Sequence, residues 1–219
     1  MDASRVITSI SVSEKHPGRL AVTVGRRVVA SLPEKIVAAL NLHVGQTWTE
    51  PLAAQVKGAR VYATALCRAT NRLAHRMMSR ARLERKLKDL SFDSLTIERV
   101  IEHLTKIGLL DDEQFGRRLI GEWQARKPTG PRLLRARLLQ RGIDRALADH
   151  LVREAAATGP SQTDGALNLA RRKLRSLSRF EPRVRRRRLY GALARRGFDA
   201  DTINEVMEQL SHELTPEET

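Results

Sequence analysis

Hydrophobic and polar residues alternate in the N-terminal part of the chain. The alternation runs through residues 6–12, 20–24 and 28–30, and Gly18 and Gly25 stand in the breaks between these runs. Period-two runs separated by turn-forming residues predict a short β-meander. Pro33 suits the first turn of a following helix, and residues 47–49 could form a last strand. The pattern therefore predicts a small, strand-rich α+β module over residues 1–58.

From residue 59 onward the apolar positions recur at helical spacing, and three stretches align without a gap. They begin at Leu83, at Leu134 (51 residues further) and at Leu189 (55 further). Eight positions agree in chemical type in all three stretches. Such internal similarity is typical of helical repeat proteins.

Each copy contains the signals for two consecutive helices. Two leucines four residues apart share one helix face, and a Gly or Ser follows where a left-handed residue is favoured. The aspartates that come two residues later, Asp93, Asp144 and Asp199, stand at the expected N-cap of the next helix. A catalytic role for these carboxylates is the alternative, but the spacing explains all three as structural caps.

An earlier helix precedes these two in every copy. It is expected over residues 59–77 in the first copy, and from the acidic first turn Asp111-Asp112-Glu113 in the second. In the third copy it ends before the break at Glu181-Pro182. The predicted fold is mainly α, an elongated array of tandem three-helix repeats behind the N-terminal module. The expected repeats are residues 59–110, 111–158 and 159–219, the last with an acidic C-terminal tail.

The charge adds a functional hint. Forty Lys and Arg face 25 Asp and Glu, a net charge of +15, which attracts polyanions. Residues 171–196 hold twelve basic residues and one acid, whereas seven acids and no Lys or Arg follow from Asp199 onward. The basic run could bind phosphates, or it could neutralise the acidic last helix through Glu205 and Glu208.

Signals for catalysis are missing from the sequence. It has no Gly-rich phosphate loop with a Lys, and its six histidines are scattered. Cys67 is the single cysteine, so no internal disulfide can form, and it is predicted to be a small core residue. No apolar run approaches the roughly 18 residues that a membrane span needs. We therefore expect a cytoplasmic protein with no enzymatic activity, cofactor, metal or membrane contact.

Several motifs resemble the RecX family of regulatory proteins. The most specific is Gly-Leu-Leu-Asp-Asp-Glu-Gln-Phe at residues 108–115, which resembles the family's link into its second repeat. Residues 76–87, 130–143 and 195–198 resemble motifs of the first, middle and last repeats. The match spans about residues 60–212, and the N-terminal module is similar to one that only some members carry. Ser91 departs from the pattern, because the family usually has Gly there.

The resemblance implies a non-enzymatic modulator of the RecA recombinase. Family members bind RecA, lie in the groove of the RecA–DNA filament and usually inhibit its ATPase and strand exchange. Single-stranded DNA binding without sequence specificity, and a role in recombination, DNA repair and the SOS response, are implied as well. We expect a monomer. A DNA-binding or architectural protein that acts without RecA is the main alternative, and a helical adaptor without nucleic acid is another.

Arginines of the middle and last repeats are the expected contacts to RecA or DNA. Residues three apart share a helix face, as Arg132 and Arg135 do. The expected contact residues are Arg132, Arg135, Arg137, Arg185, Arg186 and Arg188. A secondary basic surface is expected at Arg80, Arg82 and Arg85.

Overall fold

The structure is a computed structural model that describes residues 6–14, 17–159 and 161–214. It contains two compact units. The first comprises Met1–Met77 and Leu83–Leu109, and the second comprises Met78–Arg82 and Leu110–Thr219.

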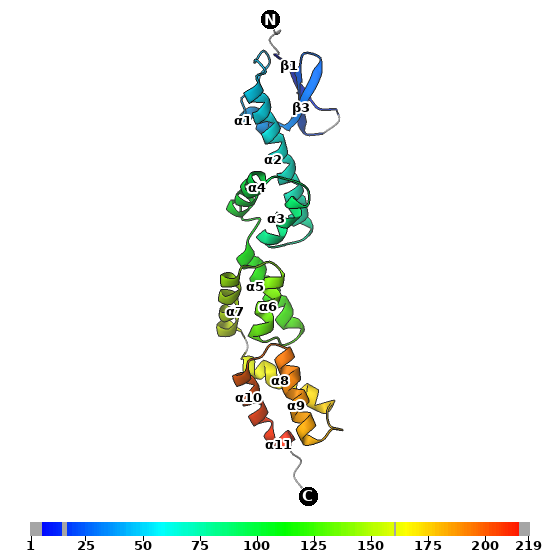
Figure 1. The fold of residues 1–219 in the computed structure, drawn as a ribbon, viewed down its shortest axis with the longest axis vertical. Coiled ribbons are helices and arrows are strands. Elements are labelled where there is room, and N and C mark those ends of the chain that lie inside the picture. Colours follow the sequence, from blue (N-terminus) through cyan, green and yellow to red (C-terminus); the bar gives the residue numbers. More distant parts are fainter. Residues whose placement is uncertain (1–5, 15–16, 160, 215–219) are drawn as a thin grey trace. The chain divides into compact units, whose positions relative to one another are not determined.

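The first unit begins with a three-stranded antiparallel sheet of order β1-β2-β3, shown in blue in Figure 1. The strands are β1 (Ile7–Val12), β2 (Arg19–Val24) and β3 (Arg27–Pro33), and a short helix, α1 (Glu34–Ala39), follows directly. Ile7, Val22 and Leu32 are fully buried and form the core of this module with Val37 of α1. The predicted strand-rich N-terminal module is confirmed.

A bulge in β1 changes which residues face this core. The pairing of β1 with β2 shifts register between Ile7 and Ser9. In a regular strand, two residues three positions apart face opposite sides of the sheet. Because of the bulge, Ile7 and Ile10 both pack toward the core. Val12, at the end of the expected apolar set, is 74% exposed.

The long helix α2 (Glu50–His75) starts nine residues before the expected residue 59. The strand predicted at residues 47–49 is wrong: Thr47 makes an isolated bridge to Val6, and Thr49 caps the helix by accepting a hydrogen bond from Leu52 N at 3.3 Å. The physical reason is the sequence of the first turn, because Glu50 and Pro51 both favour a helix N-terminus.

This helix serves both parts of the first unit. Val56 packs into the core of the sheet module, and α2 packs further along against α4 (Ser94–Lys106). Ala65 and Ala69, one turn apart, are fully buried. Cys67 lies midway between them and therefore points to the opposite side, where it is exposed. The prediction that Cys67 is a core residue is wrong.

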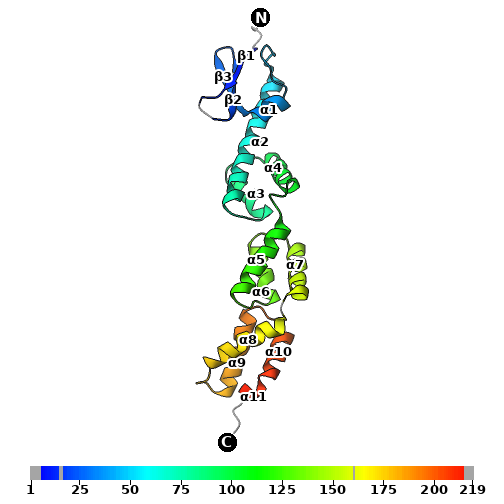
Figure 2. The ribbon, with the colours of Figure 1, turned by 180° about the vertical axis from the view of Figure 1, so that it is seen from behind.

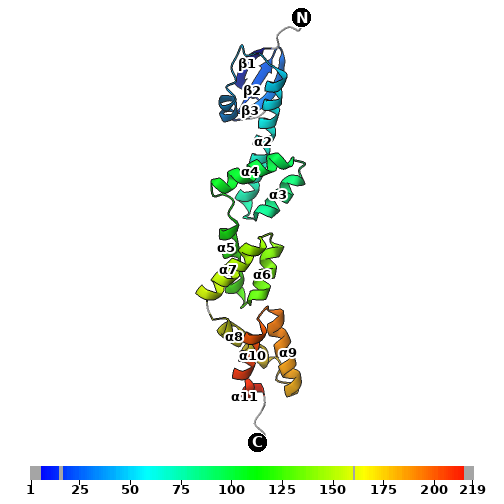
Figure 3. The same cartoon turned by 60° about the vertical axis from the view of Figure 1, so that its left-hand side comes forward.

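The remaining helices form groups of three, as the repeat pattern predicts. After α2, the chain continues with α3 (Arg80–Lys88), α4, α5 (Asp112–Arg126), α6 (Pro131–Gln140), α7 (Arg145–Thr158), α8 (Gln162–Arg175), α9 (Pro182–Arg195), α10 (Ala200–Gln209) and α11 (Ser211–Leu214). In the second unit, α5 packs on α6 and α7, and α8 packs on α9 and α10 (Figures 2 and 3). The mainly helical fold is confirmed. In the described part of the chain, no helix combines the length and apolar character of a membrane span.

The repeated motif folds in the same way in each copy. The leucine pairs that begin at Leu83, Leu134 and Leu189 are buried. Two or three residues after the end of α3, α6 and α9, one residue has a left-handed backbone, with φ of 60° at Ser91 and 82° at both Gly142 and Gly197. Two residues later an aspartate side chain accepts a hydrogen bond from a free N–H of the next helix. The pairs are Asp93 with Thr96 N at 2.9 Å, Asp144 with Ala146 N at 2.8 Å and Asp199 with Thr202 N at 2.8 Å.

Candidate polyanion-binding surface

The turn after α9 docks onto the start of α6 through backbone atoms. Gly130 N donates a hydrogen bond to Arg196 O at 2.9 Å, and Arg132 N donates to Gly197 O at 3.1 Å. A Cβ atom at Gly197 would overlap the backbone of Leu133, and one at Gly130 would overlap the backbone of Gly197. The two segments approach so closely that only glycine fits at both positions.

An equivalent contact occurs one repeat earlier, within the second unit. Ser79 Oγ donates a hydrogen bond to Arg141 O at 2.6 Å, and a Cβ atom at Gly142 would lie 2.7 Å from Ser79 Oγ. The repeat offsets of 51 and 55 residues place Ser79 on Gly130 and Arg141 on Arg196. In both cases the turn that carries the left-handed glycine contacts the segment before the second helix of the preceding repeat, through equivalent positions of the alignment.

Arg196 fixes the segment between α5 and α6. Its guanidinium donates to Pro128 O at 3.0 Å, to Lys127 O at 3.0 Å and to Thr129 Oγ1 at 2.9 Å. The pKa of Arg196 is lowered, mainly because burial disfavours its charge and also because Arg137 is close. Arg196 is thus a cation held by carbonyl oxygens in positively charged surroundings.

An open hollow of about 540 Å³ lies beside this contact. Its lining comprises Trp123, Arg126, Lys127, Arg137, Gln140, Arg141 and Arg196. The Arg137 guanidinium lies over the Trp123 indole, 5.5 Å from the ring centroid. Five of the seven lining residues are cationic and, of the residues that the structure describes, none that lines the hollow is a carboxylate. We call this feature the basic hollow.

The basic hollow contains only one of the arginines predicted from the sequence. Arg137 lines it, whereas Arg132 is exposed on the first turn of α6. Arg135 instead forms an ion pair with Asp149 of α7. The hydrogen bond from Arg135 lowers the pKa of Asp149 and raises the pKa of Arg135. Arg135 therefore contributes to packing of α6 on α7.

The arginines of α9 divide into two kinds. Arg185 donates to Ser178 O at 3.4 Å and to Phe180 O at 3.3 Å, and the Arg188 guanidinium lies 3.8 Å from the Phe180 ring centroid. Both residues thus hold the turn between α8 and α9. Arg186 and Arg187 are exposed, as is Arg188. Glu205, proposed as a partner for the basic run, accepts hydrogen bonds from Thr163 at 2.9 Å and Gln209 at 3.4 Å.

The three residues predicted to form a secondary basic surface belong to α3. Arg80, Arg82 and Arg85 are all exposed on this helix. The backbone N–H of Arg80 donates to Asp112 Oδ1 at 2.7 Å. The first two arginines belong to the second unit and Arg85 to the first.

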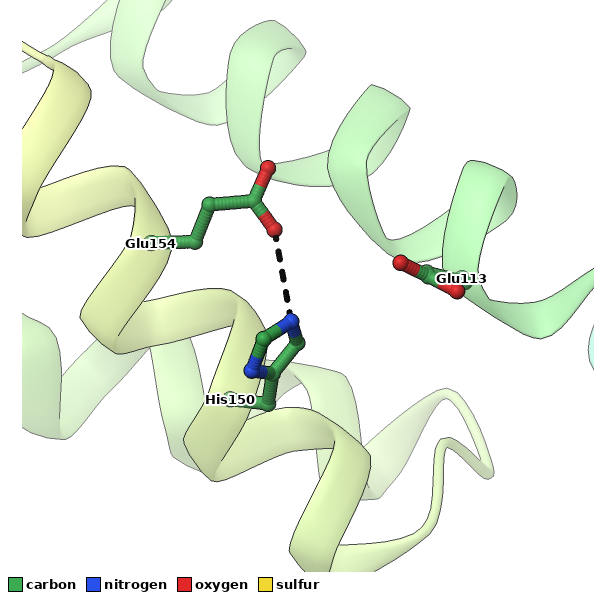
Figure 4. Close-up of side chains that lie close together, drawn as sticks. All are labelled: Glu113, His150 and Glu154. Atoms are coloured by element: carbon green, nitrogen blue, oxygen red, sulfur yellow. Dashed lines mark ion pairs between the residues drawn. The ribbon is translucent and has the colours of Figure 1, made fainter.

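Three potential metal ligands converge between α5 and α7: Glu113, His150 and Glu154 (Figure 4). His150 Nε2 lies 3.7 Å from a Glu154 carboxylate oxygen. Arg117 forms ion pairs with both glutamates, at 2.9 Å from its Nε to Glu154, and the hydrogen bond from Arg117 lowers the pKa of Glu154. Arg117 already balances these carboxylates, so the cluster is an ion-pair network that ties α5 to α7. Sequence spacing missed it because His150 and Glu113 come from different helices.

A larger hollow of about 920 Å³ lies in the first unit, between the sheet and α2. Its lining includes Trp48 and Val56, and Arg27, Lys57 and Arg60 are its cationic lining residues. Both tryptophans of the chain thus line hollows with basic side chains.

Sequence reasoning missed most of the basic hollow. Trp123, Arg126 and Lys127 come from the end of α5, and Arg196 comes from the turn after α9. No local motif joins such distant positions. The repeat alignment contained a usable signal, because the 55-residue offset superimposes Arg141 on Arg196.

Tandem three-helix groups behind a small three-stranded sheet define this protein as a helical-repeat protein. A sequence model described as the third three-helix domain of RecX matches residues 161–207. Regulatory protein RecX of Chlorobaculum tepidum is 38% identical over 144 residues, which cover 66% of this chain and 86% of that protein. The protein of the same name from Prosthecochloris aestuarii is 36% identical over 146 residues, covering 67% and 93%. The chain therefore belongs to the RecX family of regulatory proteins.

One relative and one solved structure match nearly the whole chain, and a second solved structure matches part of it. Regulatory protein RecX of Leuconostoc citreum is 25% identical over 209 residues, 94% of this chain and 77% of that protein. A crystal structure of regulatory protein RecX matches with a TM-score of 0.81 at 20% identity, covering 93% of this chain and 99% of that one. The crystal structure of RecX from Lactobacillus salivarius matches with a TM-score of 0.63 and covers 69% of this chain. These structures share the fold.

Proposed function

We propose that this protein binds RecA and the RecA–DNA filament and inhibits the recombinase without chemistry of its own. Membership of a family of regulatory proteins is the observation that carries the proposal. The protein would act as a monomer in the cytoplasm and modulate recombination and DNA repair. The described basic side chains offer a physical means, because a RecA–DNA filament exposes phosphates and protein carboxylates that arginine forks bind.

RecA's DNA-stimulated ATP hydrolysis tests the proposal directly. Hydrolysis should decrease as the protein is titrated toward a stoichiometric amount, because a bound regulator would disturb the active filament. An unchanged rate at stoichiometric protein would contradict the proposal. ATP hydrolysis by the protein alone would overturn its non-enzymatic part.

A pair of double variants on α9 locates the contact. Arg186→Gln with Arg187→Gln removes two exposed charges, and we expect filament binding to weaken with little change in melting temperature. Arg185→Gln with Arg188→Gln removes the same charge but also the contacts to Phe180, so its melting temperature should fall. Both quantities are measured by co-sedimentation and thermal unfolding. Equal filament binding by wild type and the exposed pair would remove α9 from the contact surface.

DNA binding without RecA is the alternative that the basic hollow favours, because a site rich in cations suits any nucleic acid. Co-sedimentation with RecA, in the presence and absence of DNA, separates the two functions. Binding to DNA-free RecA supports regulation of the recombinase. Strong preference for one duplex sequence, with no effect on RecA, would establish the alternative.

A further inference from the structure

We propose that the basic hollow is a phosphate site that holds the backbone of a single nucleic-acid strand. The inference builds on the proposed function, since it assigns the DNA contact to one place in the second unit. The side chains come from the end of α5, from α6 and from the turn after α9. Arg126 and Lys127 are exposed at its rim, while Arg137, Arg141 and Arg196 are partly buried in its wall.

The arrangement of charges in the hollow favours an anion. Arg137 and Arg196 are close enough to repel each other, and this repulsion contributes to the lowered pKa of Arg196. The Arg196 guanidinium is held in place by its hydrogen bonds to Pro128 O and Lys127 O, and the Arg137 guanidinium lies over the Trp123 indole. A bound phosphate would offset the repulsion and accept the bidentate hydrogen bonds that arginine offers.

The lining distinguishes a nucleic-acid strand from an acidic protein segment. Protein interfaces obtain most of their affinity from apolar anchors in a buried centre. Trp123 is the one apolar side chain among the lining residues that the structure describes. The Arg137 guanidinium lies over the indole, and an unpaired base can stack on this cation–aromatic pair. Phosphate contacts beside a stacking platform are the usual means of binding single strands.

The fluorescence of Trp123 can report binding in the hollow. The other tryptophan of the chain, Trp48, lies in the first unit and can be removed. In a Trp48→Phe background, a short oligothymidylate should change the fluorescence of Trp123 saturably. Combining Arg126→Gln, Lys127→Gln and Arg141→Gln should weaken this binding at least about tenfold and reduce the slope of log affinity against log salt by about 2, at roughly 0.7 per phosphate contact.

A matched control removes the same charge elsewhere in the second unit. Arg172→Gln, Lys173→Gln and Arg175→Gln change three exposed cations of α8. Their effect should stay below about threefold near physiological salt, where exposed charges beyond roughly 8 Å are screened. Both triple variants are melted by circular dichroism. If the hollow variant melts lower than wild type, Arg126→Gln alone, at the exposed end of α5, replaces it in the titration.

Several outcomes would overturn the assignment. Equal loss of oligothymidylate affinity in both triple variants, or wild-type affinity in the hollow variant, would show that the hollow is not the binding site. A stronger Trp123 response to polyglutamate would point to an acidic protein partner instead. An equal response to inorganic phosphate at the same phosphate concentration would mean a free-anion site. A response of Trp48 alone, tested in Trp123→Phe, would move the strand to the first unit.

The titration contains no RecA, so its failure is separate from failure of the proposed function. Inhibition of RecA by a wild-type protein whose Trp123 does not respond would remove the strand site and leave the regulator. A Trp123 response in a protein that does not affect RecA would support the strand site and contradict the proposed regulation of RecA.

Discussion

At the scale of single residues, the turn after α9 can dock onto α6 only because glycine, which has no side chain, occupies the contact positions. Gly197 combines a φ of 82° with direct contact to the Leu133 backbone. An added methyl group must displace the turn that carries Arg196 and Phe198. The same turn shapes one wall of the basic hollow, so its backbone geometry bears on stability and on binding.

Gly197→Ala should destabilise the protein by more than about 2 kcal/mol, because backbone strain of about 1–2 kcal/mol adds to the steric overlap. Urea unfolding followed by circular dichroism measures the change. Gly121→Ala is the matched control: Gly121 is exposed within α5 and nothing lies near its Cβ position. Alanine there should stabilise by roughly 0.5–1 kcal/mol. Similar unfolding curves for Gly197→Ala and wild type would show that the turn can move away freely.

Residue roles could be predicted where a local pattern determines them. The three aspartate caps and the left-handed Ser91, Gly142 and Gly197 follow from chain-local geometry, which the repeat alignment displays three times. The roles of Arg135 and Arg188 could not be predicted, because their partners Asp149 and Phe180 become neighbours only after helices pack. An arginine in a basic run looks the same in sequence whether it binds a ligand or holds a turn.

At the scale of helices and strands, periodicity identified the helices well and their starts less well. The nine residues that α2 adds before residue 59 bury few side chains, so they carry a weak apolar signal. Their helical state follows instead from the cap at Thr49 and from contact with the sheet. In β1, a bulge that no residue type announces changed which positions are buried.

The cap of α10 offers a test at this scale. Asp199→Ala should lower the free energy of unfolding by about 1 kcal/mol, because the Thr202 N–H of the first turn loses its acceptor, whereas Asp199→Asn should retain most of the stability. Thermal unfolding at neutral pH compares the three proteins. If Asp199→Ala and Asp199→Asn destabilise the protein equally, the charge of Asp199 stabilises α10, and its cap hydrogen bond does not.

Acid titration of the same variants has a defined direction. Hydrogen bonds from Thr202 hold the pKa of Asp199 below its ordinary value of 3.8. The stabilisation from its ionised form is therefore present above the unfolded-state pKa and is lost as pH falls through the lower folded-state pKa. Wild type should lose more stability than Asp199→Asn in this acidic range. Parallel curves for the two proteins down to the acid transition would contradict this linkage.

At the scale of the whole molecule, a net charge of +15 governs encounters with polyanions. This property was available from composition alone. Its distribution was only partly available, since Arg117 and Arg135 form ion pairs with carboxylates of other helices. Exposed cations such as Arg126 and Arg186 are those that a nucleic acid can reach.

Affinity of the intact protein for single-stranded DNA should therefore fall linearly on a log–log plot against salt, by about 0.7 per phosphate contacted. Oligonucleotides of equal length and different sequence should bind with similar affinity, because phosphates carry no sequence information. Fluorescence anisotropy over a range of salt concentrations measures both quantities. Salt-independent binding, or a large preference for one sequence, would show that base contacts or apolar burial dominate.

Ser91 occupies the same left-handed turn as Gly142 and Gly197, yet it carries an exposed side chain. The two later turns press against a preceding segment that leaves no room for one. The serine side chain at position 91 would block the same close contact with a preceding repeat, as expected for the first repeat of the series. If such a chain grew by duplication, new copies could be added behind the first repeat without altering it. A copy inserted ahead of it would need Ser91→Gly before the two could join in the same way.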